Sequence, residues 1–142
     1  MFKLITRFLA TFINNIMTIK LKSLRQPRDS SDGLRILITR FRPRYVKKGN
    51  ETWDAWYREL APSRQLWYDY FKTNKIDWNQ YRERFIVQMR DNPKSTELIH
   101  WLSRFENINN NITLICFCEN EKSCHRSIVK DLASNYSMAK TL

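Results

Sequence analysis

Three cysteines, a histidine and an arginine lie close together towards the C-terminal end of the sequence. Cys124-His125-Arg126 stands where a hydrophobic segment, after a short polar loop, gives way to a helical pattern. Free N–H groups and the helix dipole at such a position stabilise negative charge. A thiol placed there, beside a histidine and an arginine, has a lowered pKa and more thiolate. The same features bind an anion such as phosphate. The cluster therefore predicts either a nucleophile, with Cys124 and His125 as catalytic residues, or an anion-binding site.

The three thiols and the histidine are also possible zinc ligands. Cys116, Cys118, Cys124 and His125 follow the order C-x-C-x5-C-H, and thiolate sulfur and imidazole nitrogen are the ligands that zinc prefers. However, the paired-knuckle spacing of structural zinc sites is absent, and Cys116 is explained as a small buried hydrophobe. We therefore expect no stoichiometric zinc, no metal ligands and no other cofactor.

A second charged cluster follows another hydrophobic segment. Three arginines at alternate positions come directly after residues 34–39 (LRILIT), as Cys118 follows residues 112–117 (ITLICF). If both segments are parallel strands, the two clusters lie at the carboxyl edge of one sheet, where open α/β sheets bind ligands. Arginine suits phosphate because its planar fork pairs with two oxygens, although the cluster could instead be a solvated turn. The predicted ligand-binding residues are Arg40, Arg42, Arg44 and Arg126.

The positive charge is concentrated in the first part of the chain. The formal net charge of the 142 residues is +11. Residues 1–50 contain 12 Lys and Arg against Asp29 and Asp32, which gives +10, whereas residues 51–142 contain 13 against 12, which gives +1. Such an excess suggests a nucleic acid or a phosphorylated small molecule as partner, or it only keeps a small protein soluble.

Several classes of protein are excluded by composition. Two glycines, Gly33 and Gly49, are too few for the glycine-rich phosphate loops of nucleotide-binding folds. Three cysteines without a signal peptide argue against a secreted disulfide framework, so we expect reduced thiols and a cytoplasmic protein. No run approaches the roughly 20 apolar residues of a membrane span.

Residues 1–16 differ from the rest of the chain. Their apolar positions follow helical spacing, and no acidic residue precedes Asp29. This pattern is typical of an organelle presequence or a surface-binding helix. We expect instead an amphipathic extension or a mis-assigned start, followed by a single domain over residues 17–142 whose fold does not need the extension.

Hydrophobic periodicity predicts strands at both ends of this domain and helices between them. The expected strands are residues 18–22, 34–39 and 112–117. The expected helices are residues 52–60, 66–71, 78–89 (capped by Asp77), 95–105 and a last helix that opens at Ser123 or Cys124. This order predicts an α/β fold with a small, mostly parallel sheet flanked by helices in a Rossmann-like three-layer arrangement. The strands at residues 34–39 and 112–117, which come before and after the helices in the sequence, should be parallel neighbours or next neighbours in the sheet.

The helical region is rich in Trp and Tyr. At helical spacing these side chains are expected in the core, because aromatic residues bury large areas. The alternative is a platform on which nucleic-acid bases stack.

The order of motifs is similar to that of the YeaO-like family, also called the domain of unknown function 488. The resemblance rests on residues 39–44 (TRFRPR), Trp53-x-x-Trp56, residues 60–63 (LAPS) and Cys116-x7-Cys124-His125-Arg126, and it covers about Thr18 to Tyr136. The family pattern reads Asp-Arg-x-Trp-Pro-Arg-Gly. Here Thr39, Arg42 and Tyr45 replace its acid, tryptophan and glycine, which speaks against an acid–base role there. The resemblance implies a compact α/β fold and no established activity.

Two functions remain open on the sequence alone. One is an enzyme in which Cys124 or His125 acts on a phosphorylated or nucleic-acid-like substrate that the arginines hold. The other is a non-catalytic nucleic-acid-binding module in which the same arginines neutralise phosphates. The sequence does not determine the oligomeric state.

Overall fold

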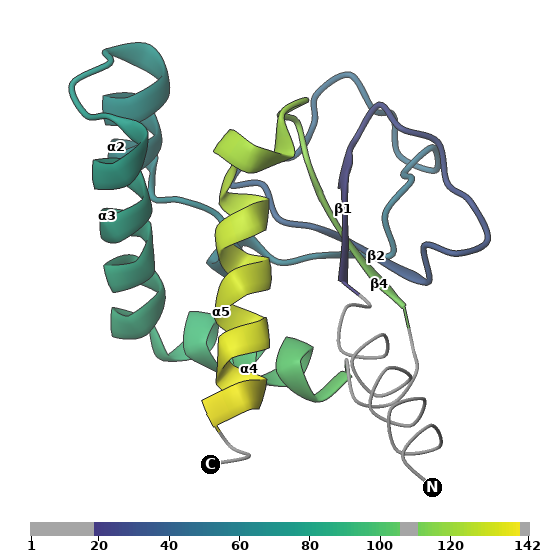
Figure 1. Cartoon of the computed structure of the whole chain (residues 1–142). Coiled ribbons are helices and arrows are strands. Elements are labelled where there is room, and N and C mark those ends of the chain that lie inside the picture. The colour runs from purple at the N-terminus through teal and green to yellow at the C-terminus, as the bar shows by residue number, and fades with distance from the viewer. Residues whose placement is uncertain (1–18, 106–110, 140–142) are drawn as a thin grey trace, which may run out of the picture.

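The computed structural model describes residues 19–105 and 111–139 (Figure 1). The predicted extension, residues 1–16, lies outside these residues. The strands are β1 (Ile19–Ser23), β2 (Leu34–Leu37), β3 (Ala55–Trp56) and β4 (Ile112–Cys116). The helical elements are η1 (Arg58–Leu60), α2 (Arg64–Trp67), η2 (Tyr68–Lys72), α3 (Trp78–Asp91), α4 (Pro93–Phe105), η4 (Glu121–Ser123) and α5 (His125–Ala139). No helix within the described ranges is long and apolar enough to cross a membrane.

The four strands form one parallel sheet in the order β1-β4-β2-β3. The predicted neighbours β2 and β4 pair directly, with Leu34 opposite Ile112. β4, the last strand in the chain, lies between β1 and β2 and is buried along its whole length. Its five consecutive buried residues explain the continuous apolar run, because a central strand of a covered parallel sheet is enclosed on both faces. The predicted α/β fold with a small parallel sheet is confirmed.

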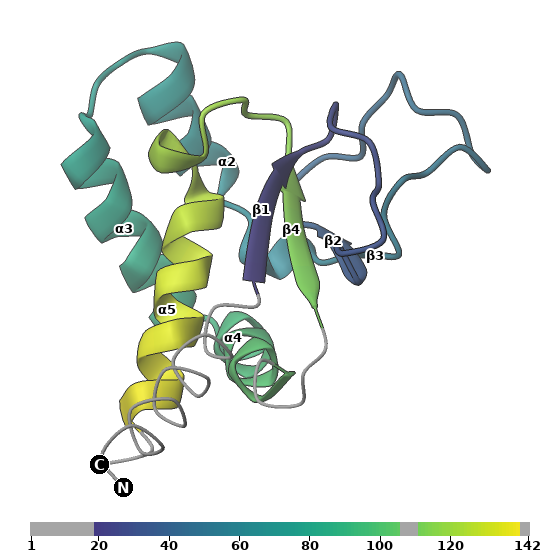
Figure 2. The ribbon, with the colours of Figure 1, turned by 45° about the vertical axis from the view of Figure 1, so that its right-hand side comes forward.

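The two faces of the sheet are covered differently. Ile36, Ile38 and Leu114 pack against buried side chains of α3, α4 and α5. On the other face, Leu37 and Ile115 form a smaller cluster with Leu24, against which Val46, Trp53 and Trp56 pack. Figure 2 shows α3 and α5 on one side of the strands and the long loops on the other. The Rossmann-like, three-layer detail is therefore not confirmed, since helices cover a single face in the part of the chain that the structure describes.

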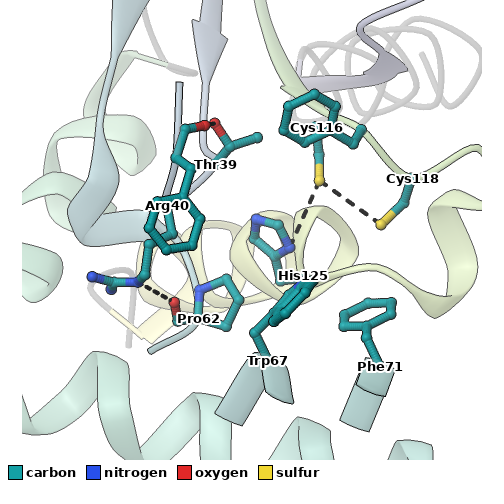
Figure 3. A pocket seen from close by; sticks show the side chains of 10 residues that line it. Thr39, Arg40, Pro62, Trp67, Phe71, Cys116, Cys118 and His125 are labelled. Carbon is teal, nitrogen blue, oxygen red and sulfur yellow. Dashed lines mark hydrogen bonds between the residues drawn. The ribbon is translucent and has the colours of Figure 1, made fainter. Parts of the chain in front are cut away.

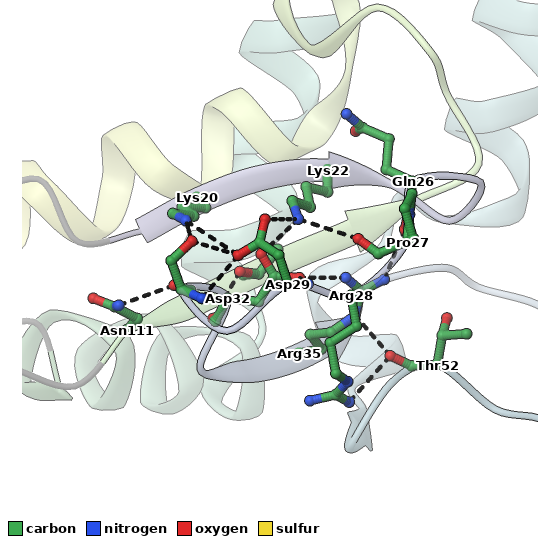
Figure 4. A network of polar contacts seen from close by, with 12 residues as sticks. Lys20, Lys22, Gln26, Pro27, Arg28, Asp29, Asp32, Arg35, Thr52 and Asn111 are labelled. Carbon is green, nitrogen blue, oxygen red and sulfur yellow. Dashed lines mark hydrogen bonds and ion pairs between the residues drawn. The ribbon is translucent and has the colours of Figure 1, made fainter.

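A buried ion pair explains how loops can cover the second face. Arg35 on β2 and Asp32 before it are both completely buried and form a salt bridge (Figure 4). Arg35 also donates to the carbonyl oxygens of Thr52 at 2.7 Å and Gln26 at 3.2 Å, so it satisfies backbone groups of two loops at once. Lys22 Nζ lies 2.6 Å from the other carboxylate oxygen of Asp32. Burial opposes the ionisation of Asp32, but hydrogen bonds from Lys22 and Arg35 outweigh it and hold its pKa below the usual range.

The predicted helix over residues 52–60 is wrong. The segment forms β3 and the short η1 instead. Its backbone N–H groups hydrogen-bond to the edge of β2. The N–H of Asp54 donates to the Arg35 carbonyl oxygen at 2.8 Å, and the N–H of Tyr57 donates to the Leu37 carbonyl oxygen at 2.9 Å. Its apolar residues also divide between the two faces of the sheet, because Trp56 packs on the loop face and Tyr57 on the helical face. Apolar residues three and four positions apart therefore occur in this segment although it is not a helix.

The remaining predicted helices are present with slightly different bounds: residues 66–71 fall in α2 and η2, and the last helix begins at His125 and not at Ser123 or Cys124. α3 begins after Asp77, which forms a capping box: its carboxylate accepts from the Gln80 N–H at 2.8 Å, and its own N–H donates to the Gln80 side chain at 2.9 Å. The inner face of α3 carries the fully buried Tyr81 and Phe85. These two rings stack with a centroid distance of 6.2 Å, so this part of the aromatic stripe belongs to the core as expected.

We expect Asp77→Ala to destabilise the protein by about 1 kcal/mol, because the first turn of α3 loses its side-chain acceptor. The free energy of unfolding in urea measures this loss. Glu83→Ala, on the exposed side of the same helix, is the matched control and should change stability by less than about 0.5 kcal/mol. Equal values for the two variants would show that the capping box contributes nothing.

Candidate functional site

The sulfur cluster lies at the carboxyl edge of the sheet. β4 ends at Cys116, a short loop carries Cys118 and η4, and Cys124 immediately precedes α5. Because the loop returns the chain to the end of the strand that it left, the three sulfurs meet. Cys116 Sγ lies 3.9 Å from Cys118 Sγ and 4.0 Å from His125 Nδ1 (Figure 3). Cys124 Sγ lies 3.6 Å from the same nitrogen.

His125 is held in one orientation. Its ring is buried, and Nε2 lies 2.6 Å from the carbonyl oxygen of Ile38. A carbonyl oxygen only accepts, so Nε2 carries the hydrogen, and Nδ1 faces the sulfurs of Cys116 and Cys124. The contact joins α5 to the end of β2, and it brings His125 to the segment that carries the predicted arginines.

The pKa values of the clustered cysteines are shifted in different directions. Hydrogen bonds from Cys116 and Cys118 lower the pKa of Cys124, burial opposes this shift, and His125 adds to it. A hydrogen bond with Cys118 lowers the pKa of Cys116, but donation to Cys124 and burial outweigh it and raise that pKa to about 12. For His125, burial lowers the pKa, but the interaction with Cys124 outweighs it and the pKa is raised. The negative charge of the cluster is therefore centred on Cys124.

Arg126 lies behind the cysteines. Its side chain is 1% exposed. Nε donates to Cys124 Sγ at 3.3 Å, and Nη2 donates to the Cys118 carbonyl oxygen at 2.7 Å. No carboxylate of the described residues pairs with this buried guanidinium. Arg126 thus compensates negative charge on the cluster, and the structure does not place it on the wall of the neighbouring pocket.

A pocket of about 220 Å³ opens above the cluster. Cys116, Cys118 and His125 form one part of its wall, whereas Cys124 is completely buried behind them. The rest of the wall is mostly aromatic and comes from residues 39–41, from residues 62–71 and from Phe117. These other lining residues are Thr39, Arg40, Phe41, Pro62, Trp67, Phe71 and Phe117.

The three predicted arginines have different surroundings. Arg40 lines the pocket, and its Nε donates to the Pro62 carbonyl oxygen at 2.5 Å (Figure 3). Arg42 pairs with Glu51 at 2.8 Å and donates to the Val46 carbonyl oxygen at 2.7 Å, so it also holds its own loop together. Arg44 is exposed. Only Arg40 therefore meets His125 in the pocket, while Arg42 and Arg44 line an adjacent groove.

This groove, of about 580 Å³, continues the pocket across the surface. Phe41, Trp67 and Phe117 line both. The groove is lined by four cationic and five aromatic residues and by no acid: Phe41, Arg42, Arg44, Tyr45, Arg64, Trp67, Tyr68, Lys72 and Phe117. We call the pocket and this groove together the aromatic–basic surface.

Part of this surface was not predicted. Trp67 and Phe71 are assigned to the core by their helical spacing, yet they are 36% and 39% exposed, so that assignment is wrong. The opposite face of the same helical stretch, with Leu66, supplies the core. The signal in the sequence is the row Arg64, Trp67, Tyr68, Phe71 and Lys72, which repeats every three or four residues and combines aromatic with basic side chains.

Comparison with known proteins agrees with this set of motifs. The family model described as "Active DUF488-N3 subclade" matches residues 19–137. The chain is 26% identical over 115 residues to "Uncharacterized protein YeaO" of Escherichia coli (strain K12), an alignment that covers 81% of this chain and 96% of that protein. No solved structure gives a significant match. The resemblance to this family over about Thr18 to Tyr136 is thereby confirmed, and the chain belongs to the YeaO-like DUF488 family.

Proposed function

We propose that this protein binds a single-stranded nucleic acid along the aromatic–basic surface and acts on a base that enters the pocket. The observation that carries the proposal is the continuity of the two parts: a small pocket walled by aromatic rings, with thiols and an imidazole at one side, opens into an acid-free groove lined by arginine and lysine.

The groove favours a strand over a small phosphorylated metabolite. Single-stranded nucleic acids are bound by basic grooves that follow the backbone and by aromatic side chains on which bases stack. Tyr45 and Phe41 are 66% and 58% exposed and line the same groove, and contiguous exposed apolar surface is typical of interaction sites. Lys72 Nζ lies 5.6 Å from the centre of the Trp67 ring, so charge and stacking surface coincide.

The pocket favours one base over a larger ligand. Its volume of about 220 Å³ is below the roughly 300–1,000 Å³ of sites for drug-sized ligands. Enzymes that act on bases take the base out of the stack into a pocket lined by aromatic and apolar side chains. A base between Trp67 and Phe41 would lie against Cys118 and His125. Arg40 lines the same pocket, where its guanidinium can bind the phosphate of that nucleotide or a carbonyl oxygen of its base.

Fluorescence anisotropy with a labelled 15-nucleotide single strand of mixed sequence tests the binding step. We expect Trp67→Ala to raise Kd by about 5- to 150-fold, because stacking contributes about 1–3 kcal/mol per base. Arg64→Ala should reduce the slope of log K against log salt by about 0.7, the value for one single-strand phosphate contact. Far-UV circular dichroism of each variant checks that the fold is kept.

Matched controls lie on α3, outside the lining of the pocket and of the groove. Arg82→Ala removes a half-exposed arginine that pairs with Asp131, and Val87→Ala removes an exposed apolar side chain; neither should change Kd. If the strand does not bind, or if Arg82→Ala weakens it as much as Arg64→Ala does, the aromatic–basic surface is not the binding site. A shallow salt dependence together with competition by inorganic phosphate would identify a small phosphorylated ligand instead.

Catalysis and simple binding are separated by the product. Mass spectrometry of the strand after incubation with the protein shows a changed base in the first case and an unchanged strand in the second. Cys118→Ser should abolish such a change without altering Kd, because the Cys118 side chain lies in the pocket and outside the groove lining. An unchanged strand with wild-type protein would leave the second candidate, a non-catalytic nucleic-acid-binding module, which the complete burial of Cys124 favours.

A further inference from the structure

We propose that Cys116, Cys118, Cys124 and His125 form a four-ligand site for a zinc-like cation at the base of the pocket. The spacing of the cysteines is unusual for a zinc site and by itself argues against zinc. Spacing is only a guide to which side chains meet, however. Here the loop after β4 and the start of α5 place the ligand atoms of Cys116, Cys124 and His125 within 4.8 Å of one another, and Cys118 Sγ lies 3.9 Å from Cys116 Sγ. The inference concerns the state of the cluster and holds whether or not a nucleic acid binds above it.

Two of the distances between the ligand atoms match the edges of a tetrahedral site. Zn–S bonds of about 2.3 Å and Zn–N bonds of about 2.0–2.1 Å give S···S edges of about 3.8 Å and S···N edges of about 3.5–3.6 Å. In the structure, the Cys116 and Cys118 sulfurs are 3.9 Å apart, and Cys124 Sγ is 3.6 Å from His125 Nδ1. Cys116 Sγ lies 4.0 Å from the same nitrogen, so a bound cation would draw this pair closer. The ligand atoms of Cys116, Cys124 and His125 all lie within 4.8 Å of one another.

The imidazole is oriented as a metal ligand. Metal-binding histidines commonly donate the N–H that does not face the metal to a carbonyl or carboxylate oxygen, which fixes the tautomer and the ring plane. His125 has this arrangement, since Nε2 meets the Ile38 carbonyl oxygen at 2.6 Å. Its Nδ1 lone pair is directed into the group of sulfurs.

Arg126 supplies the remaining charge. Three thiolates around a divalent cation have a net formal charge of minus one, and burying that charge alone is costly. The buried Arg126, whose Nε is 3.3 Å from Cys124 Sγ, makes the assembly neutral. This also explains why a guanidinium can be buried there without a carboxylate partner among the described residues.

Metal content of the purified full-length protein tests the proposal. The protein is expressed in zinc-supplemented medium, kept under reductant, gel-filtered and analysed for metals; we expect one zinc per chain. Reaction with a thiol reagent should be slow until a chelator is added, because the cysteines are metal ligands. Co²⁺ added to the metal-free protein should give the intense visible absorption of a tetrahedral site with sulfur ligands.

Variants locate the site. Cys118→Ser removes the least buried ligand and should release zinc at lower chelator concentration, whereas Ser123→Ala in the same loop should not. Arg126→Gln should lower the affinity about 10- to 100-fold, as losses of second-shell partners do. Circular dichroism identifies any variant that fails to fold. If Arg126→Gln fails to fold, Cys118→Ser still tests the site, because the Cys118 side chain is partly exposed and its replacement disturbs the core least.

A folded wild-type protein that retains no zinc, reacts rapidly at its thiols and binds Co²⁺ only with weak octahedral absorption would overturn the proposal. The cluster would then be a set of hydrogen-bonded thiols. Strand binding, measured by anisotropy with metal-loaded and metal-free protein, is a separate readout. Failure of that binding with one zinc per chain would refute the proposed function and leave the metal site intact.

Discussion

Asp32→Asn is expected to destabilise the protein by about 3–5 kcal/mol, the usual loss when one partner of a buried ion pair is removed. The amide keeps the size of the side chain but takes away the negative charge opposite Arg35, and both residues are completely buried. Arg35 then remains as a buried cation whose other acceptors are the carbonyl oxygens of Thr52 and Gln26. Urea unfolding at neutral pH measures the change, with an unchanged m-value.

An exposed pair provides the control for this variant. Arg25 and Glu119 are 2.9 Å apart, with both side chains 76% exposed, and Glu119→Gln makes the same chemical change without burial. Its effect should lie within experimental error. If Asp32→Asn and Glu119→Gln unfold at the same urea concentration as the wild type, the buried pair does not stabilise the fold. Asp32→Asn combined with Arg35→Met should recover part of the loss, because no unpaired charge is then buried.

The free energy of unfolding measured at acidic pH is a second test of the Asp32→Asn variant. The pKa of Asp32 is lower in the folded protein than its ordinary value of 3.8. The stabilisation is therefore complete above the unfolded-state pKa and is lost as the pH falls through the lower, folded-state pKa. Asp32→Asn should flatten the decline of stability below about pH 4. An identical decline in the variant would mean that other carboxylates cause it.

Gly33→Ala is expected to destabilise the protein by about 2–6 kcal/mol, because two separate costs add. Gly33 has φ +61°, and a Cβ there would lie 2.0 Å from the carbonyl oxygen of Asn111. That oxygen accepts the hydrogen bond of the Leu34 N–H at 3.0 Å, at the point where β2 begins to pair with β4. The backbone of Asn111 cannot move away without disturbing this pairing, so the contact is not relieved cheaply.

Gly49→Ala separates the two costs. Gly49 also has positive φ, +92°, but nothing lies within 4 Å of its Cβ position. This variant should lose only the conformational part, about 1–3 kcal/mol. The difference between the two free energies of unfolding measures the contact with Asn111. A Gly33→Ala variant no less stable than Gly49→Ala would show that the loop at Asn111 shifts freely.

The structure separates the basic residues of the N-terminal half into those that form internal ion pairs and those that are exposed. Several of these cations are used internally: Lys22 and Arg35 surround Asp32, and Arg42 pairs with Glu51. Arg44, in contrast, is exposed in the groove. The part of the excess that is available to a polyanion is therefore smaller than the count for residues 1–50, and Arg64 and Lys72 from the second half of the chain complete it.

Local pattern determined much of the fold. The apolar runs at residues 34–39 and 112–117 predict buried strands because both faces of a central parallel strand are covered, and Asp77 predicts the start of α3 because its carboxylate satisfies free N–H groups. The edge rule for parallel sheets placed Arg40 near His125, and both line one pocket. These inferences depend on neighbours in the chain or on a general property of sheets.

Other features depended on side chains that meet only after the chain folds. Residues 53–60 have helical spacing but are bound by the edge of β2, and Trp67 and Phe71 have core spacing but face a groove. The loops replace a third layer because Arg35 satisfies their carbonyl groups. The spacing of the cysteines by itself determined that thiols gather near the start of the last helix. Only the tertiary structure decided that Cys124 is buried, that Cys118 lines the pocket and that the ligand atoms of Cys116, Cys124 and His125 lie within 4.8 Å of one another. Burial and interatomic distance are set by packing between distant segments.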